Sequence, residues 1–278
     1  MISDFPHQQH AHCESGVTVN LLKHEGVTIS EPMVFGLGAG LYFVHVPFIR
    51  VSGAPATGYR NWFMTIFKKS IRRLGGRTNS HQFSSVDAGM EKMDRLLEQG
   101  KPVGMVGNVY YLDYLPEIYR FHFTGHNLVV YTEKDGAYEV SDPLLEDVSS
   151  ISAEKLKAAR FSPIFPRTRG RLYYIEDVGH ATVTPAGVIE SINEVCYNMV
   201  VPPIPWIGCR GIQTLAKRIA RYPRQYPEKD IVRYLSNIVQ MQEVIGTGGA
   251  ASVLCTLPSS RKQRKDSTIR LYLQCRPD

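Results

Sequence analysis

The chain of 278 residues lacks a paired-cysteine motif, a long apolar segment and a basic-then-apolar leader at its N-terminus. Its five cysteines include no Cys-x-x-Cys pair, which excludes zinc-ribbon and thioredoxin-type sites. A disulfide framework is not expected at this density of cysteine. No apolar run reaches the length of a membrane span. We therefore expect a protein of the reducing cytoplasm, without a signal peptide.

Charge is also sparse, because Asp, Glu, Lys and Arg together make up 21% of the chain. That is too little for a disordered protein, and the 43% hydrophobic content supports a sizeable core. The net charge of +6 suits an acidic partner. Part of the excess lies in residues 68–77, which form either a solvated helix face or a docking surface for an acidic partner. The cations of this face are Lys68, Lys69, Arg72 and Arg73.

Hydrophobic periodicity predicts an α+β protein. The expected helices are residues 13–25, a short one from Ser30, and 61–74, 84–99, 152–159, 184–199, 211–221 and 227–244. The expected strands are residues 41–46, 103–106, 126–132, 137–140 and 171–175. This order predicts a sheet-containing domain over 1–165 and a helical domain over 166–250. An atypical basic tail over 251–278 is interpreted either as a frameshift product or as a disordered segment.

Cys13 is the candidate nucleophile. It lies in His10-Ala11-His12-Cys13-Glu14-Ser15-Gly16, at the first turn of a predicted helix. The positive end of the helix macrodipole lowers the pKa of a thiol in that position. A cysteine nucleophile also needs a base and a group that orients the base. His12 is a poor candidate for the base, because adjacent side chains on a helix diverge.

A predicted hairpin supplies the other two groups. His126 begins one strand, Asp142 follows the next, and Lys134-Asp135-Gly136 between them is a turn of the Asp-Gly type. An antiparallel hairpin brings its open ends together, so His126 and Asp142 are expected to be neighbours. The order Cys, His, Asp is that of papain-like enzymes, in which the cysteine opens a helix that packs on the sheet carrying the other two residues.

The remaining parts of such a site are less defined. An oxyanion hole would use the backbone N–H of Cys13 and a side chain just upstream, with Gln8, Gln9 and His10 as candidates. His12, Gly38 and Asn127 are further candidates for contacts to the substrate or oxyanion. Gly38 belongs to the run 35–40, whose spaced glycines indicate either a loop beside a site or tight packing. His10, His12 and Glu14 hint at a metal site, but no further ligands have suitable spacing, so no metal is expected.

These motifs resemble the butirosin biosynthesis protein H family. The similarity covers about residues 10 to 250: residues 12–16, 30–31, 35–40, Gly125-His126 and Ser141-Asp142-Pro143 resemble its N-terminal domain, and the helical region ending in Ile245-Gly246-Thr247-Gly248-Gly249 resembles its usual C-terminal domain. The resemblance implies a papain-like fold, similar to bacteriocin-processing cysteine peptidases. It implies Cys13 as nucleophile, His126 as base and Asp142 as orienting group.

The named member of that family is an acyltransferase, which moves an aminoacyl group from an acyl-carrier-protein thioester to an aminoglycoside amine. The resemblance thus implies an acyltransferase of secondary metabolism, acting through a Cys13 acyl-enzyme on an amine or hydroxyl acceptor. The expected partners are an acyl carrier protein and a small-molecule acceptor, with neither nucleic acid nor a membrane. No cofactor is expected beyond the carrier's phosphopantetheine. The alternatives are a cysteine peptidase or amidase, and a non-catalytic binding module.

Overall fold

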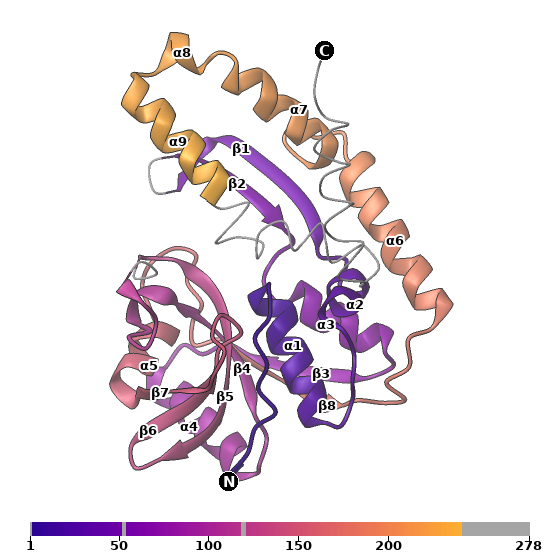
Figure 1. The fold of residues 1–278 in the computed structure, drawn as a ribbon, viewed down its shortest axis with the longest axis vertical. Coiled ribbons are helices and arrows are strands. Elements are labelled where there is room, and N and C mark those ends of the chain that lie inside the picture. Colours follow the sequence, from indigo (N-terminus) through magenta and orange to yellow (C-terminus); the bar gives the residue numbers. More distant parts are fainter. Residues whose placement is uncertain (1, 52–53, 118–120, 241–278) are drawn as a thin grey trace.

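The computed structural model describes residues 2–51, 54–117 and 121–240, in two lobes. The lower lobe in Figure 1 contains a six-stranded sheet with helices on both faces. The upper lobe contains a two-stranded hairpin and the last helices. The long helix α6 (Pro185–Val200) leaves the lower lobe and leads into the upper one.

The six-stranded sheet is antiparallel throughout and has the order β3-β8-β4-β5-β6-β7. Its strands are β3 (Arg77–His81), β4 (Val103–Asn108), β5 (Thr124–Lys134), β6 (Ala137–Ser141), β7 (Ser149–Ser152) and β8 (Leu172–Asp177). The chain reverses between β5 and β6 at Asp135 and Gly136, both with positive φ, as the Asp-Gly sequence predicts. The central strands β4 and β5 are buried on both faces.

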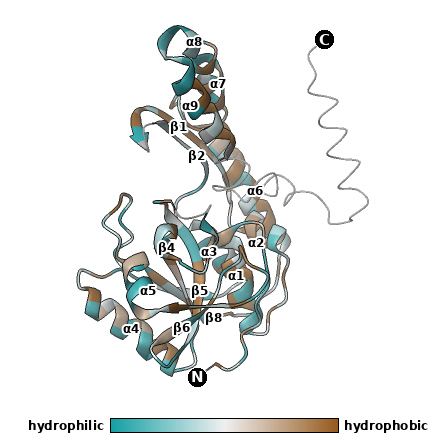
Figure 2. Ribbon diagram, turned by 60° about the vertical axis from the view of Figure 1, so that its left-hand side comes forward, coloured by the Kyte–Doolittle hydropathy of each residue, from teal (hydrophilic) through white to brown (hydrophobic). Residues whose placement is uncertain are grey.

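Helices cover the two faces of this sheet. On one face lie α1 (Cys13–His24), α2 (Glu31–Leu37) and α3 (Thr65–Arg73), whose apolar side chains join Val129 and Tyr131 of β5 in one core. On the other lie α4 (Val86–Glu98) and α5 (Ala153–Arg160), which join Leu128 and Val130 in a second core. Successive strand residues point to opposite faces, so β5 contributes to both cores. Figure 2 shows hydrophobic ribbon along β5, β8 and α1.

The upper lobe is built around the hairpin of β1 (Leu41–Val51) and β2 (Ala54–Arg60). Helix α7 (Gly208–Ile219) packs on β1, and α9 (Glu228–Gln240) packs on β2. The short helix α8 (Tyr222–Gln225) connects α7 and α9. Helix α6 contacts α2 in the lower lobe and β1 and α7 in the upper one.

The structure corrects three expectations. The helix expected over 61–74 is shorter, because β2 runs to Arg60 and α3 begins only at Thr65. Strands β2, β3 and β7 were not predicted, since they are short or rich in polar residues and glycine. A domain boundary at 165 falls too early, because β8 lies between β3 and β4 in the sheet. The tail over 251–278 lies outside the described residues.

The α+β architecture is confirmed: a helix that begins with Cys13 packs on an antiparallel sheet, and a mostly helical region follows. None of the helices in the described residues has both the length and the hydropathy to cross a bilayer.

Candidate active site

Cys13 is the first residue of α1, and the segment before it is held by several hydrogen bonds. The His12 side chain caps the helix by accepting from the backbone N–H of Ser15 at 3.3 Å. The Glu31 carboxylate, at the start of α2, accepts from the backbone N–H groups of Ala11 and His12 at 3.0 and 2.8 Å. It also accepts from the Ser15 hydroxyl at 2.9 Å. The half-buried thiol therefore projects from a helix start whose backbone is fixed.

The hairpin of β5 and β6 brings His126 and Asp142 together, as its turn predicts. The Nε2–H of His126 donates to Oδ2 of Asp142 at 2.8 Å, since a carboxylate can only accept. Asp142 Oδ2 also accepts from the Tyr114 hydroxyl at 2.8 Å, and Oδ1 accepts from the backbone N–H of Leu144 at 3.0 Å. Asp142 occupies Nε2 and leaves Nδ1 of His126 to other partners, and the nearby His126 ring lowers the pKa of the Cys13 thiol.

The charges of the three groups support one another. Burial opposes a charged His126, but the Asp142 carboxylate and the Cys13 side chain together outweigh it and raise the His126 pKa to about 10. Burial likewise opposes the Cys13 thiolate, but the His126 hydrogen bond and the Arg60 charge lower the Cys13 pKa to about 7. Burial also opposes the Asp142 carboxylate, but His126 holds its pKa below the usual value. Above pH 7 the site thus favours a thiolate–imidazolium pair.

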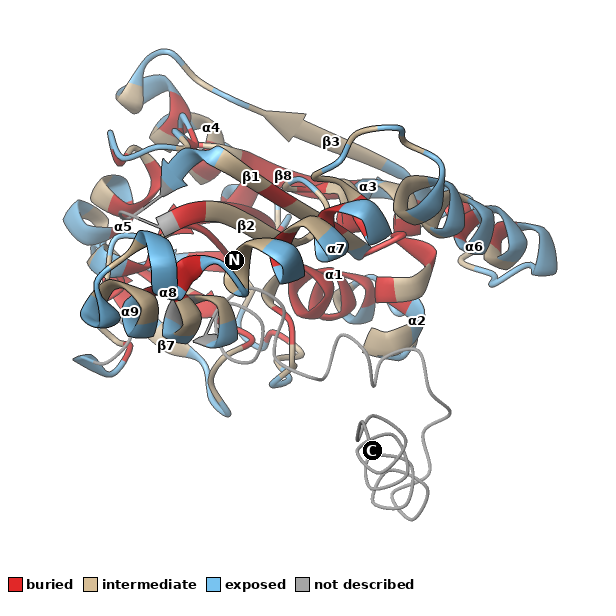
Figure 3. Ribbon diagram, turned by 90° about the horizontal axis from the view of Figure 1, so that it is seen from above, coloured by how far each residue is buried: buried red, intermediate tan, exposed pale blue. Residues whose placement is uncertain are grey.

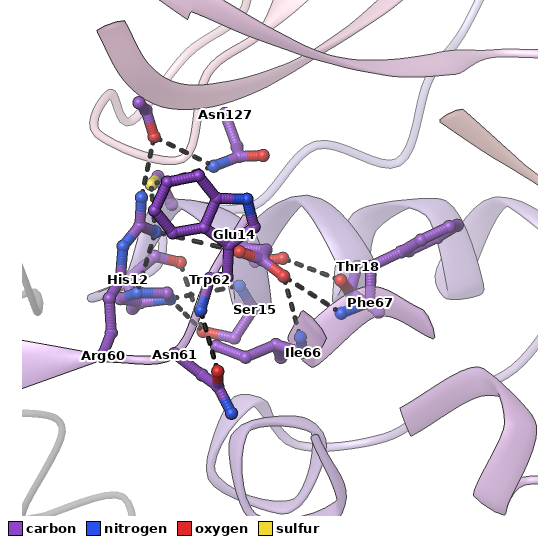
Figure 4. Close-up of polar contacts among 12 residues, drawn as sticks. His12, Glu14, Ser15, Thr18, Arg60, Asn61, Trp62, Ile66, Phe67 and Asn127 are labelled. Atoms are coloured by element: carbon purple, nitrogen blue, oxygen red, sulfur yellow. Dashed lines mark hydrogen bonds and ion pairs between the residues drawn. The ribbon is translucent and has the colours of Figure 1, made fainter. Parts of the chain in front are cut away.

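Two further donors approach the sulfur. Nη1 of Arg60, the last residue of β2, lies 3.8 Å from Cys13 Sγ, and Nη2 donates to the carbonyl oxygen of Gly125 at 2.9 Å (Figure 4). Nδ2 of Asn127 lies 3.6 Å from the same sulfur. The Oδ1 of Asn127 accepts from the Tyr173 hydroxyl at 2.8 Å, which orients the amide with its N–H groups toward the thiol.

Glu14 places a buried carboxylate beside the Arg60 guanidinium. Its side chain is 1% exposed, and Oε1 accepts from the backbone N–H groups of Ile66 and Phe67 at 2.8 and 3.2 Å (Figure 4). Its Oε2 has no hydrogen-bond partner but lies 3.8 Å from Nη1 of Arg60. Burial raises the Glu14 pKa, and Arg60 opposes that shift. Glu14 therefore ties α1 to the start of α3 and supplies a counter-charge for Arg60.

The structure separates the other predicted site residues. Asn127 reaches the thiol, and His12 lies beside it with Nε2 at 3.4 Å from Arg60 Nη1. Burial and Arg60 lower the His12 pKa to about 3, so this ring is neutral. Gln9 is exposed and donates to the carbonyl oxygen of Leu144, while His10 bonds Asn20 at 3.1 Å. Gln8, the third upstream candidate, is also exposed. In this structure Gln9 and His10 thus have partners other than the thiol.

Gly38 also has a packing role instead of a place in the site. A Cβ at this position would lie 2.6 Å from the backbone of Ile66, so glycine allows α2 to approach α3. The suggested metal ligands His10, His12 and Glu14 face three different partners, namely Asn20, Ser15 and the start of α3. Within the described ranges, no group of three or more His, Cys, Asp and Glu side chains is arranged to hold a metal ion.

The basic face of α3 is neutralised within the chain. Lys69 pairs with Glu194, Arg72 pairs with Glu190, and Arg73 binds both glutamates, with Nη2 at 2.6 Å from Glu194 Oε2. Both glutamates belong to α6. This cluster joins the two lobes. Of the four cations, Lys68 and Arg72 are exposed, and Arg72 is paired with Glu190.

Sequence reasoning missed Arg60, Glu14 and Tyr114. The signals for Arg60 and Glu14 were weak, because a single charged residue in a polar stretch reads as a surface residue. Tyr114 belongs to an aromatic stretch that was interpreted as a loop over the core edge or a cleft, and its hydroxyl in fact supports Asp142. Arg60 and Tyr114 reach the site only through long-range packing, whereas Glu14 adjoins Cys13 in the chain and is buried through its contacts with α3.

The fold and the arrangement of Cys13, His126 and Asp142 define a papain-like cysteine enzyme. The family model described as butirosin biosynthesis protein H, N-terminal, matches residues 12–143, and a model described as a domain of unknown function (DUF4872) matches residues 154–251. The chain belongs to the butirosin biosynthesis protein H family.

Two solved structures resemble the chain at low identity. One is assigned as a C39-like peptidase from Bacillus anthracis, with a TM-score of 0.43, 16% identity, and coverage of 63% of this chain and 96% of that one. The other is the peptidase domain of Streptococcus ComA, a bi-functional ABC transporter involved in quorum sensing, with a TM-score of 0.39, 16% identity, and coverage of 62% and 98%. A search of curated protein sequences finds no match.

Proposed function

We propose that the protein is an acyltransferase that takes an acyl or aminoacyl group from an acyl-carrier-protein thioester and passes it, through a Cys13 acyl-enzyme, to an amine or hydroxyl acceptor. The observation that carries the proposal is a thiol at the first residue of α1, activated by its neighbours, beside a His126 ring that is hydrogen-bonded to Asp142. Membership of the butirosin biosynthesis protein H family favours transfer in the biosynthesis of a secondary metabolite. The compartment we propose is the cytoplasm.

In the first half-reaction the Cys13 thiolate attacks the thioester carbonyl. The bond between the carbonyl carbon and the carrier sulfur then breaks, and the carrier thiolate takes a proton from the His126 imidazolium. Exchange between two thioesters is nearly balanced in energy, so a thiol with a pKa of about 7 is a suitable nucleophile. The product is an acyl group on Cys13 and a neutral His126.

In the second half-reaction the neutral His126 accepts the proton of an incoming amine as the amine attacks the acyl-enzyme. The bond to Cys13 Sγ breaks, and the thiolate is regenerated beside the imidazolium. The net change converts an acyl thioester and an amine into an amide and the free carrier thiol. Asp142 holds the His126 ring in one orientation throughout.

The test uses carrier proteins loaded with acetyl and aminoacyl groups. We expect the intact mass of the protein to rise by the acyl group, the adduct to map to Cys13, and added amines to remove it as amides. Cys13→Ser abolishes the adduct, whereas Cys196→Ser, at an exposed thiol on α6, leaves it unchanged. If no carrier thioester labels Cys13 while peptides are cleaved, the protein is a peptidase or amidase. If neither reaction occurs, the site is a binding module.

A further inference from the structure

The described site leaves one catalytic role without a residue. When a thiolate adds to a carbonyl, the carbonyl oxygen becomes negatively charged, and papain-like enzymes stabilise it with preorganised N–H donors. The backbone N–H of Cys13 is one donor, because the first residues of a helix have no intrahelical acceptor. Of the three upstream side chains expected to supply the second, Gln8 and Gln9 are exposed. Gln9 donates to Leu144, and His10 bonds Asn20.

Arg60 lies where such a donor is needed. Its side chain is 11% exposed, and the guanidinium is held on several sides: by the Gly125 carbonyl at 2.9 Å, by Glu14 at 3.8 Å and by the Phe63 ring, whose centre lies 5.5 Å from Cζ. Nη1 faces the sulfur at 3.8 Å. An oxygen on a carbon bonded to Sγ can lie closer to this donor than the sulfur does, within the roughly 2.7–3.1 Å that an oxyanion donor requires.

Asn127 supports the same assignment from the sheet. Its Nδ2 lies 3.6 Å from Sγ, and Tyr173 fixes the orientation of its amide. Arg60 and Asn127 both lie next to Gly125, since Nη2 of Arg60 and Nδ2 of Asn127 donate to that one carbonyl oxygen. A cation and an oriented amide thus converge on the thiol from β2 and β5.

We infer that Arg60 is the oxyanion-stabilising residue of the acyl transfer at Cys13, and that the C-terminal helices set its position by holding the β1–β2 hairpin. The inference rests on the proposed function and assigns one further catalytic group within it. A charge-assisted hydrogen bond from a guanidinium is about twice as strong as one between neutral groups. Glu14 balances the Arg60 charge before the oxyanion forms.

The hairpin links Arg60 to the helical region through contacts along its length. The backbone N–H of His45 donates to the carbonyl oxygen of Trp206 at 2.8 Å. Arg50 Nη1 donates to the Tyr234 hydroxyl at 2.8 Å, and the Tyr59 hydroxyl donates to the carbonyl oxygen of Ile238 at 3.4 Å. Tyr59 directly precedes Arg60 at the end of β2. The contact of Tyr59 with α9 therefore holds the backbone of β2 one residue before Arg60.

Two reactions of Cys13 separate oxyanion stabilisation from thiolate stabilisation. Alkylation by iodoacetamide requires only the thiolate, whereas acylation by p-nitrophenyl acetate also passes through a tetrahedral oxyanion. Both rates are measured from pH 6 to 10, and their plateau values are compared. Arg60→Met keeps much of the side-chain stem but removes the charge. We expect it to lower the acylation plateau about 100-fold, the size of effect for one oxyanion donor, and to change the alkylation plateau less than about threefold.

Arg60→Lys keeps the positive charge that pairs with Glu14 but lacks the planar guanidinium with its several fixed N–H donors. We therefore expect an acylation rate between those of the wild type and Arg60→Met. Arg77→Met, at an exposed arginine on β3, is the matched control and leaves both rates unchanged. Equal losses in acylation and alkylation for Arg60→Met and Arg60→Lys would overturn the assignment, as would no loss in either. Absence of acylation in the wild-type protein above the Cys13→Ser background would also overturn it.

The probe ester needs no carrier protein, so the two proposals fail separately. If p-nitrophenyl acetate labels Cys13 and Arg60→Met slows only that reaction, the Arg60 assignment holds even where no carrier thioester reacts. If carrier thioesters react but Arg60→Met slows acylation and alkylation equally, the acyltransferase proposal holds and the Arg60 assignment is wrong.

Discussion

The two lobes contribute to one site in different ways. The lower lobe holds Cys13, His126 and Asp142 on a helix and a hairpin whose parts near the site are largely buried, and α1 is red over most of its length in Figure 3. The upper lobe contributes Arg60 from the end of a hairpin whose supporting helices α6, α7 and α9 carry many exposed apolar side chains. The nucleophile and its base are thus placed by a dense core, whereas the proposed oxyanion donor is placed by a more exposed scaffold.

The ion-pair cluster between α3 and α6 connects the two lobes. Arg73 is buried and binds Glu190 and Glu194 as well as the carbonyl oxygen of Leu37, so it joins α6 to the lower lobe. A surface interpreted from the sequence as either a solvated helix face or a docking face therefore contributes to holding the lobes together. The predictions below perturb first the lower lobe and then the upper one.

The largest effect is expected from Asp142→Asn. Loss of the carboxylate removes the charge that raises the His126 pKa, and the Cys13 thiolate loses its imidazolium partner. We expect acylation by p-nitrophenyl acetate to fall about 100-fold or more at pH 7.5. The midpoint of the alkylation pH profile should move upward. Asp135→Asn, in the turn of the same hairpin, is the control and should leave both measurements unchanged. Near wild-type acylation in Asp142→Asn would show that His126 needs no orienting carboxylate.

A second prediction concerns the core beneath the site. A Cβ at Gly104 of β4 would lie 2.3 Å from the Tyr173 ring, whose hydroxyl orients Asn127. Overpacking of this kind costs typically about 1–3 kcal/mol. Gly104→Ala should therefore lower the free energy of unfolding by that amount, measured as a lower midpoint of urea unfolding. Gly36→Ala in α2 meets no atom within 4 Å and should instead stabilise by roughly 0.5–1 kcal/mol. Equal stability of the two variants would contradict the tight packing of β4 on β8.

The pH dependence of acylation should follow the ionisation of the Cys13 thiol and not that of the His126 imidazole. The Cys13 pKa is lowered to about 7, so the reactive thiolate is lost as pH falls through 7, with about a tenfold rate decrease from pH 8 to pH 6. The His126 pKa is raised to about 10, so the imidazolium persists across this range. Both values belong to a coupled pair. A midpoint near 8.5, the value of a free thiol, would show that the site does not activate Cys13.

The smallest effect is expected in the upper lobe from Tyr234→Phe. This change removes the acceptor of the Arg50 hydrogen bond but keeps the ring, which costs about 1 kcal/mol. We expect faster amide hydrogen exchange in β1 and β2 and less than a fivefold loss of acylation. Tyr197→Phe, at an exposed ring on α6, is the matched control. Unchanged exchange in the hairpin would indicate that α9 does not hold it.

Local features of the site were predictable, because each depends on neighbours in the chain. The helix that begins at Cys13 follows from apolar spacing, and its end follows from Gly26, which has positive φ. The pairing of β5 and β6 follows from one Asp-Gly turn, and it was sufficient to predict the contact of His126 with Asp142. These inferences span few residues, so little chain-closure entropy and few alternative pairings compete with them.

The long-range features were not predictable in the same way. The position of β8 between β3 and β4, the burial of Glu14 and the approach of Arg60 to Cys13 join segments that are far apart in sequence. No local pattern distinguishes these residues from surface residues. Asn127 is an intermediate case: it adjoins His126 in the chain, but its amide is turned toward the thiol by Tyr173, which belongs to β8.

The sequence by itself determined the nucleophile helix, the hairpin that pairs the base with its carboxylate, and the α+β order of elements. Helix caps, turn chemistry and apolar periodicity act over a few residues and are encoded where they act. Only the tertiary structure decided which charged groups surround the thiol, because the pKa of Cys13 and the position of Arg60 depend on segments that packing brings together. The electrostatics of this site is therefore a property of the packed fold.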